Sequence, residues 1–167
     1  MIASGEVRVR PARLADVQAI ADLNNRFAAE ALMLRRPPEV IALAVDDYMV
    51  AVDARGNLLA CGALKEYSPS LAEVAAIAVA PEAHGRGLGR TIVRAVEMLA
   101  LKRGITELFA LTLQPQFFGA IGYAEVDRSR YPEKIRRACT GCARRFACDE
   151  ICFMRDLAQD MQLSVAA

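Results

Sequence analysis

The sequence lacks an excess of charge of either sign, and it lacks any long apolar run. Its 167 residues carry 21 basic and 20 acidic side chains, a formal net charge of +1, so overall charge does not direct the chain to nucleic acid. Apolar stretches such as Val74 to Pro81 fall far short of the roughly 20 residues that a membrane-spanning helix needs. These absences favour a soluble protein that acts on a small molecule, with neither a membrane nor nucleic acid as partner.

The N-terminus also lacks the apolar core of a secretory signal. Met1 to Pro11 mixes acidic and basic residues, and nothing in it directs the chain out of the cytoplasm. We therefore expect a cytoplasmic protein whose five cysteines are reduced. With no internal repeat or low-complexity tract, the chain predicts a single domain over residues 1–167, with a core at about 6–128 and an extension at about 129–167.

Hydrophobic periodicity predicts a mixed α/β fold. The expected strands are 7–10, 48–52, 58–65, 73–80, 108–113 and 123–126, and the expected helices are 17–31, 39–44, 88–103 and 115–121. The unit from Glu73 to Leu113 should pair its strands in parallel through a right-handed crossover. The stretch from Pro132 to Leu157 should be mostly helical. The predicted fold class is therefore α/β: a mixed, mostly antiparallel sheet flanked by helices, with a C-terminal helical Cys-rich extension.

Three alternate glycines lie between an expected strand and an expected helix, from His84 to Gly89. Glycine lets a backbone approach a ligand closely, and a helix start offers unpaired amides with a partial positive charge. The segment predicts an anion site that suits a pyrophosphate. A Walker loop would need Lys-Ser or Lys-Thr where Arg90 and Thr91 stand, and the glycine spacing does not fit the dinucleotide fingerprint. The alternative is a tight turn without a ligand.

This segment resembles the acetyl-CoA loop of GNAT acetyltransferases, whose pattern is Gln or Arg, two residues, Gly, one residue, then Gly or Ala. His84 departs from the pattern at its first position, while Gly87 and Gly89 fit it. The resemblance runs from Val7 to about Val126, and it implies a GNAT-like fold that binds acetyl-CoA. The cofactor-binding residues that it implies are Ile77, Ala78, Val79, His84, Gly85, Arg86, Gly87, Leu88, Gly89, Arg90, Thr112 and Phe118.

Acetyl transfer to an amine needs a proton acceptor, because a thioester reacts only with the neutral amine. Glu73 opens the expected strand that carries Ile77, and it matches the position where several GNAT enzymes keep a glutamate general base. We predict that Glu73 is catalytic; the alternative is a solvated charge at a strand end. Many members have a tyrosine that protonates the leaving thiolate where this chain has Phe118, which cannot donate a proton. Cys61 is not assigned as a nucleophile.

A narrower resemblance covers nearly the whole chain. It rests on Glu30 to Arg36, Ala72-Glu73, Thr112 with Phe117-Phe118, and Pro132 to Lys134 with the Cys-rich tail. Together these segments resemble short N-acetylglutamate synthases. The resemblance implies acetyl transfer to the α-amine of glutamate, the first step of arginine synthesis, and a homodimer is common among such enzymes.

Substrate recognition is predicted for Arg36 and Lys65, because each could contact a carboxylate of glutamate. Arg36 matches a family arginine in the loop that usually borders the acceptor site. One alternative is a GNAT enzyme for another amine, such as glutamine, a peptide N-terminus or an antibiotic. A second is a regulatory module that binds acetyl-CoA without turnover.

The C-terminal region contains the pattern Cys139-x2-Cys142-x5-Cys148-x3-Cys152. Four thiols are enough for a tetrahedral zinc site, but the spacing departs from the usual arrangement of two knuckles. Packed reduced cysteines and a redox pair are the alternatives, and we predict no metal. The same region is basic, which a solvated face, an anion-binding rim or a partner surface would each explain; its basic residues are Arg128, Arg130, Lys134, Arg136, Arg137, Arg144 and Arg145.

Overall fold

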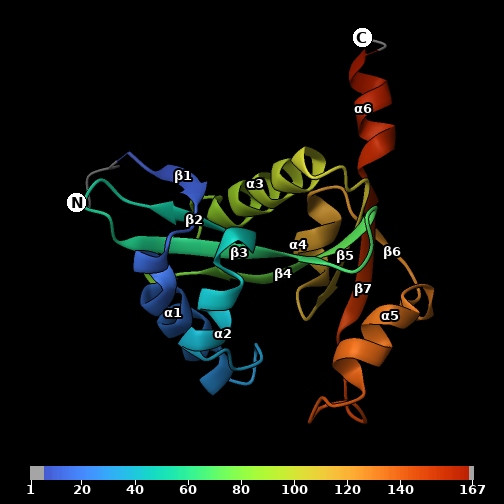
Figure 1. Cartoon of the computed structure of the whole chain (residues 1–167), viewed down its shortest axis with the longest axis horizontal. Coiled ribbons are helices and arrows are strands. Elements are labelled where there is room, and N and C mark those ends of the chain that lie inside the picture. The colour runs from blue at the N-terminus through green and yellow to red at the C-terminus, as the bar shows by residue number, and fades with distance from the viewer. Residues whose placement is uncertain (1–5, 166–167) are drawn as a thin grey trace. The chain divides into compact units, whose positions relative to one another are not determined.

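The structure is a computed structural model that describes residues 6–165, with side chains up to residue 162. The first five residues of the segment inspected for a secretory signal therefore lie outside the described part. The chain divides into two compact units, residues 1–65 with 74–99 and residues 66–73 with 100–167. Figure 1 shows the elements of both. The single domain inferred from the sequence stays a prediction.

The first unit contains an antiparallel sheet. Its strands are β1 (Arg8–Pro11), β2 (Tyr48–Val52), β3 (Leu58–Glu66, up to Lys65) and the part of β4 (Leu71–Val79) from Val74 onward. β1 pairs antiparallel with β2, and β2 with β3. The amide of Ala80 donates to the carbonyl of Leu59 at 2.8 Å, which continues the antiparallel ladder from β3 to β4.

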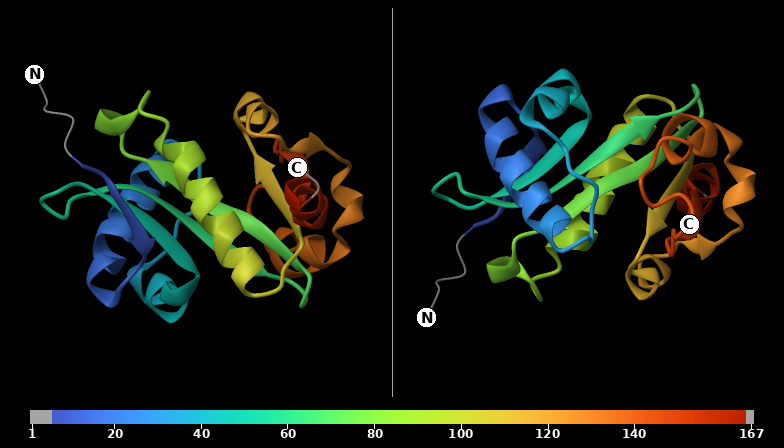
Figure 2. Two further views of the ribbon diagram at one scale, coloured as in Figure 1. Left: turned by 90° about the horizontal axis from the view of Figure 1, so that it is seen from above. Right: turned by 90° about the horizontal axis from the view of Figure 1, so that it is seen from below.

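Helices cover both faces of this sheet. They are α1 (Val17–Ala29), α2 (Pro38–Leu43) and α3 (Leu88–Lys102, up to Leu99), with 3-10 turns at Leu14–Asp16, Val45–Asp47 and Pro81–Ala83. Figures 1 and 2 show α1 and α2 on one face and α3 on the other. Asp16 accepts the amide of Arg13 at 2.7 Å and the guanidinium of Arg10 at 2.7 and 2.9 Å. Asp16 thus caps the 3-10 turn that precedes α1 and ties β1 to it.

The second unit begins with the first residues of β4 and adds three strands. These are β5 (Glu107–Thr112), β6 (Ala124–Glu125) and β7 (Ile151–Asp156). β4 pairs in parallel with β5, so that Glu73 lies opposite Phe109, and β7 runs antiparallel to both β5 and β6. The complete strand order is β1-β2-β3-β4-β5-β7-β6. The parallel pair that the crossover pattern predicts is confirmed.

The helical segments of the second unit are short. They are α4 (Pro115–Ala120), a 3-10 turn at Arg128–Arg130, α5 (Pro132–Lys134), a π-helical stretch at Ile135–Cys139 and α6 (Leu157–Val165). α3 ends in this unit at Gly104, whose φ of +79° is the left-handed conformation that glycine adopts at no steric cost. Among the residues described, no helix is long and apolar enough to cross a membrane.

The predicted fold class is confirmed, with one correction in the C-terminal extension. The expectation of mostly helix from Pro132 to Leu157 is wrong after Cys139, because Ile151–Asp156 is the strand β7. β7 inserts between β5 and β6 with Cys152 and Phe153 buried. Its ladder partners on β5 lie 39 to 49 residues away in the sequence, so the local hydrophobic pattern alone could not distinguish a strand from a short helix.

Gly62 marks the closest approach of α3 to the sheet of the first unit. A Cβ at this position would lie 2.5 Å from Cδ1 of Ile77 and 2.6 Å from Cγ2 of Ile92. Both atoms are well inside contact distance, and the methyl of Ile92 sits on its β-carbon and has little freedom to move. The absent side chain of Gly62 therefore lets the helix pack against β3 and β4.

We predict that Gly62→Ala lowers the free energy of unfolding by about 1–3 kcal/mol, because the added methyl overpacks this contact. The measurement is a chemical or thermal unfolding curve. Gly119→Ala in α4 is the matched control, since a Cβ there meets nothing within 4 Å and alanine favours the helix. Equal stability of the two variants would contradict the prediction.

Candidate active site

The segment between β4 and α3 has the backbone of an anion-binding loop. Gly85 and Gly87 have φ of +75° and +74°, a conformation that residues with a side chain rarely adopt. A Cβ at either position would meet no atom within 4 Å. The glycines are therefore required by the backbone path rather than by packing. The space that their missing side chains leave is available to a ligand.

The start of α3 adds donors to this loop. The amide and the hydroxyl of Thr91 both donate to the carbonyl of Gly87 at 3.1 Å, so the first helical bond closes at Thr91. The amides of Leu88 and Gly89 precede that bond and lie at the positive end of the helix. Nε2 of His84 lies 2.9 Å from the carbonyl of Val79, which joins the loop to the end of β4. This geometry fits a pyrophosphate.

β4 is irregular just before the loop. Ala76 has a φ of +53°, which breaks the alternation of side chains between Glu73 and Ile77 as a bulge does. Ile77 and Val79 are part-exposed, and Ala78 is buried. The Cys61 thiol donates to the carbonyl of Ala76 at 3.8 Å, and burial raises the pKa of this thiol to about 12. Cys61 is therefore a neutral thiol at physiological pH, which agrees with its omission as a nucleophile.

Glu73 lies in the second unit and is buried, with 5% of its surface exposed. The ammonium of Lys134 contacts both carboxylate oxygens, at 2.8 Å and 2.9 Å. The hydroxyl of Tyr67 donates to Oε2 at 3.0 Å. The alternative of a solvated strand-end charge is wrong, and Glu73 is the third residue of β4 rather than its first. It is a buried, ion-paired carboxylate.

Thr112 and Phe118 also lie in the second unit, and both are buried. Thr112 ends β5, three residues beyond the position paired with Glu73, and its hydroxyl accepts the amide of Gln114 at 2.8 Å. Phe118 in α4 packs edge-on against Tyr123, with ring centroids 5.2 Å apart. Tyr123 is buried as well. The cofactor contacts of Thr112 and Phe118 stay predictions.

The two residues predicted to bind the acceptor belong to the first unit and differ in environment. Lys65 is exposed. Arg36 is part-buried, and its backbone is clamped on both sides by Asn25, which accepts the amide of Arg36 at 2.9 Å and donates to its carbonyl at 3.1 Å. Nε of Arg36 is buried without a hydrogen-bond partner among the described residues.

Tyr67 and Lys134 are the residues that sequence reasoning missed as partners of Glu73, the predicted catalytic residue. Lys134 lies 61 residues after Glu73, and Tyr67 follows β3 in the hairpin that leads to β4. Neither residue forms a motif with Glu73 in the sequence. The hairpin between β3 and β4 brings Tyr67 to Glu73, and the fold of residues 131–139 brings Lys134.

The cysteines and basic residues of the C-terminal region have defined surroundings. All five cysteines are free thiols, and in the described part of the chain no group of three or more potential ligands stands where it could hold a metal ion. The basic side chains have partners within the chain: Glu150 carbonyl for Arg128, Glu107 for Arg130, Glu73 for Lys134, Glu133 for Arg136 and Arg137, Asp149 for Arg144 and Thr140 carbonyl for Arg145. This partnering weakens the interpretation of the region as an open anion-binding rim.

Comparison with known families identifies the family of this chain. Residues 17–126 match the family described as Acetyltransferase (GNAT) family. The chain belongs to the GNAT family. GNAT enzymes use acetyl-CoA as their co-substrate, and the glycine conformations and the start of α3 fit its pyrophosphate. The chain is therefore an acetyl-CoA-dependent N-acetyltransferase.

Two curated relatives are similar over most of the chain. An uncharacterized N-acetyltransferase of Chlorobaculum tepidum is 40% identical over 149 residues, which cover 89% of this GNAT chain and 96% of the relative. An amino-acid acetyltransferase of Mycobacterium tuberculosis is 32% identical over 121 residues, which cover 71% of this chain and 69% of the relative.

Two solved structures share the fold. N-acetylglutamate synthase from Neisseria gonorrhoeae, complexed with coenzyme A and N-acetyl-glutamate, matches with a TM-score of 0.81 and 26% identity over 92% of this chain. The GNAT chain spans only 36% of that synthase. A Mycobacterium tuberculosis protein in complex with CoA and NLQ matches with a TM-score of 0.77 and 27% identity, over 90% of this chain and 99% of that one.

We predict that Gly87→Val weakens acetyl-CoA binding by roughly tenfold or more, because the side chain strains a left-handed position and enters the space in front of the helix amides. Isothermal titration calorimetry measures the change. Gly104→Val is the matched control: it also replaces a glycine of positive φ with open space around it, at the other end of α3. Equal affinities of the two variants would separate the loop from the cofactor site.

Proposed function

We propose that this GNAT enzyme transfers acetyl from acetyl-CoA to the α-amine of L-glutamate, the first step of arginine biosynthesis. The names of the similar proteins support an amino acid as acceptor, because one relative is an amino-acid acetyltransferase and one structural neighbour is an N-acetylglutamate synthase solved with N-acetyl-glutamate. A homodimer stays an expectation.

The proposal of an acidic acceptor rests on the fixed backbone of Arg36 and on the hydrogen bonding of its guanidinium. The clamp by Asn25 fixes the backbone of Arg36, and the buried Nε has no partner among the described residues. The guanidinium lies near Tyr48, whose pKa is raised chiefly by burial. A planar guanidinium with a donor left unused suits a carboxylate, which it can bind through two parallel hydrogen bonds. We assign Arg36 to a carboxylate of the acceptor, with Lys65 as a second candidate.

Glu73 is the proposed general base. An α-ammonium must lose one proton before its nitrogen lone pair can attack the thioester carbon, and the Glu73 carboxylate takes that proton directly or through one water. In the transfer a C–N bond forms and the C–S bond breaks, with the bonding pair leaving on sulfur. The second amine proton reaches this thiolate through solvent, because Phe118 has no proton to give. The proton on Glu73 returns to solvent, so the products are the amide, the free thiol and one proton.

Two other functions compete with this proposal. The chain could acetylate another amine, such as glutamine, a peptide N-terminus or an antibiotic. It could also bind acetyl-CoA as a regulatory module without turnover, as the phenylalanine at position 118 allows. The basic C-terminal residues form ion pairs within the chain. These ion pairs weaken the argument that a regulatory module would use this region to bind nucleic acid.

A panel of amines in a thiol-release assay tests the proposed function. We expect glutamate to give the highest kcat/KM. A higher value for glutamine, a peptide or an aminoglycoside would reject glutamate while retaining the enzyme. Tight acetyl-CoA binding without turnover of any amine would select the regulatory module.

We further predict that Arg36→Met raises the KM for glutamate roughly 10- to 100-fold, the equivalent of one charge-assisted contact of about 1.5–3 kcal/mol. The KM for acetyl-CoA should stay unchanged. Arg35→Met is the matched control, because Arg35 is the exposed neighbour of Arg36. If both variants keep the wild-type KM for glutamate, Arg36 does not contact the acceptor.

A further inference from the structure

The hydrogen bonds of Glu73 show which of its two carboxylate oxygens has fewer partners. Oε2 accepts two hydrogen bonds, from Lys134 at 2.9 Å and from Tyr67 at 3.0 Å, whereas Oε1 accepts one, from Lys134 at 2.8 Å. An ionised carboxylate offers about four acceptor sites. Within the described part of the chain, these three contacts leave one acceptor site, and it is on Oε1.

We propose that Lys134 and Tyr67 are positioning residues for Glu73, and that together they reserve Oε1 for the proton of the acceptor amine. This inference rests on the proposed function, because it assigns the machinery around the general base. Lys134 holds both oxygens from one side, and Tyr67 fixes the rotation of the carboxylate by binding Oε2. A proton acceptor must be held within about 0.5 Å and 10–20° of its working geometry, which three hydrogen bonds provide.

An aromatic stack holds these two partners in place. Phe109, the residue opposite Glu73 on β5, stacks on Tyr131 with centroids 4.1 Å apart and contacts Tyr67 at 5.4 Å. Tyr131 immediately precedes α5, so its burial against Phe109 sets the point from which Lys134 extends. The stack therefore fixes the ring of Tyr67 and the start of the segment that carries Lys134.

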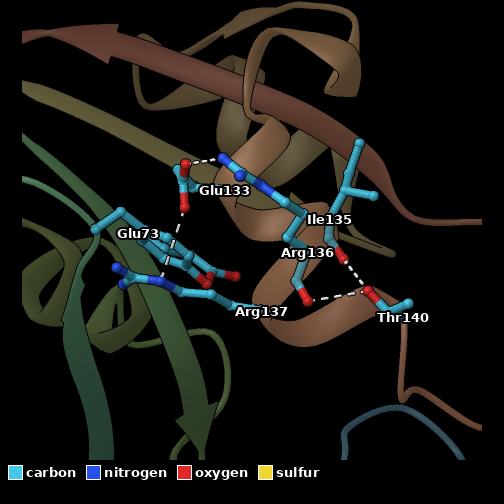
Figure 3. Close-up of polar contacts among 7 residues, drawn as sticks. Glu73, Glu133, Ile135, Arg136, Arg137 and Thr140 are labelled. Carbon is cyan, nitrogen blue, oxygen red and sulfur yellow. Dashed lines mark hydrogen bonds and ion pairs between the residues drawn. The ribbon is translucent and has the colours of Figure 1, made fainter.

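The helical segment that carries Lys134 is closed by its own polar contacts, shown in Figure 3. Glu133 pairs with Arg136 and Arg137. The hydroxyl of Thr140 donates to the carbonyls of Ile135 and Arg136, at 2.8 and 2.9 Å. These bonds end the segment right after Cys139. Lys134 takes no part in these contacts, and its ammonium binds Glu73 instead.

Stability alone is a poor reason for this arrangement. The Lys134 and Glu73 side chains are only 16% and 7% exposed, and burying an ion pair costs desolvation that often cancels its attraction. Well-packed apolar side chains would give equal or greater stability. An ion pair at the predicted base is instead explained by the need to hold a charged acceptor in one orientation.

The other titratable and charged groups around Glu73 do not replace these two residues. Burial, followed by the charge of Glu73 and its hydrogen bond, raises the pKa of Tyr67, so that Tyr67 remains a donor at all working pH values. Burial raises the pKa of Cys152 to about 11, with Glu73 a further contributor. Burial also raises the pKa of Cys139. The Arg137 guanidinium lies over the Tyr67 ring at 5.3 Å.

The test is a double-mutant cycle in the full-length protein with glutamate and acetyl-CoA. We expect Lys134→Met to lower kcat roughly 10- to 100-fold, within the range that a positioned base contributes, and Tyr67→Phe to lower it roughly 3- to 10-fold for one neutral hydrogen bond. Lys134→Arg should recover part of the loss. Glu73→Gln combined with Lys134→Met should be no slower than Glu73→Gln alone, since residues that act as one unit are not additive.

The pH profile separates positioning from a structural role. The losses of Lys134→Met and Glu73→Gln should both shrink at high pH, where free amine is abundant and the carboxylate is needed less. Arg136→Met, an exposed neighbour on the same segment with a side chain 69% exposed, should keep wild-type kcat. The KM for acetyl-CoA should be unchanged throughout.

Several outcomes would overturn the inference. Wild-type kcat in a folded Lys134→Met protein, or a loss that is equal at all pH values and accompanied by a lower melting temperature, would make the pair structural. Additive losses in the double mutant would mean that Lys134 acts apart from Glu73, for example on a substrate carboxylate. If the enzyme prefers another amine, the cycle is run with that amine, so the substrate proposal can fail while the inference stands. A wild-type protein that acetylates no amine would end both.

Discussion

The second unit is organised around the burial of one carboxylate. Glu73 lies on β4 beside the parallel strand β5, and an unpaired charge there would cost several kcal/mol. The structure meets this constraint with two partners, Tyr67 from the hairpin six residues earlier and Lys134 from 61 residues later. Residues 131–139 must then lie over β4 and β5, and the chain that follows returns as β7 in the ladder beside β5. The ion pair and the buried side chains of Tyr131, Cys152 and Phe153 together connect the extension to the sheet.

The first unit meets a different constraint, because the site predicted for the pyrophosphate is built from backbone amides. Left-handed Gly85 and Gly87 turn the chain from β4 into α3, and Thr91 closes the first helical bond behind them. This explains why a histidine is acceptable where the family has Gln or Arg. The His84 ring contacts the carbonyl of Val79 and so stabilises the loop, while the anion is left to the amides.

The chemistry that the two units offer is asymmetric. The proposed base is a carboxylate with one less-bonded oxygen, whereas at the position where many family members have a thiolate-protonating tyrosine there is Phe118, buried among aromatic rings. Cys61 and Cys152 have raised pKa values because of burial, which disfavours the thiolate that a covalent route would need. Direct attack by the amine is the route that these groups support.

The sequence by itself determined the family, the phosphate loop, the class of fold and the position of most strands and helices, because these depend on local patterns such as the glycines before α3 and the apolar face of that helix. The tertiary structure decided the rest. β7 is a strand only because β5 and β6 flank it, and Glu73 is buried rather than solvated only because Lys134 approaches it from 61 residues away. Contacts of that kind leave no periodic signal in the chain, since two residues that meet across a sheet or an ion pair share no spacing that a local pattern could record.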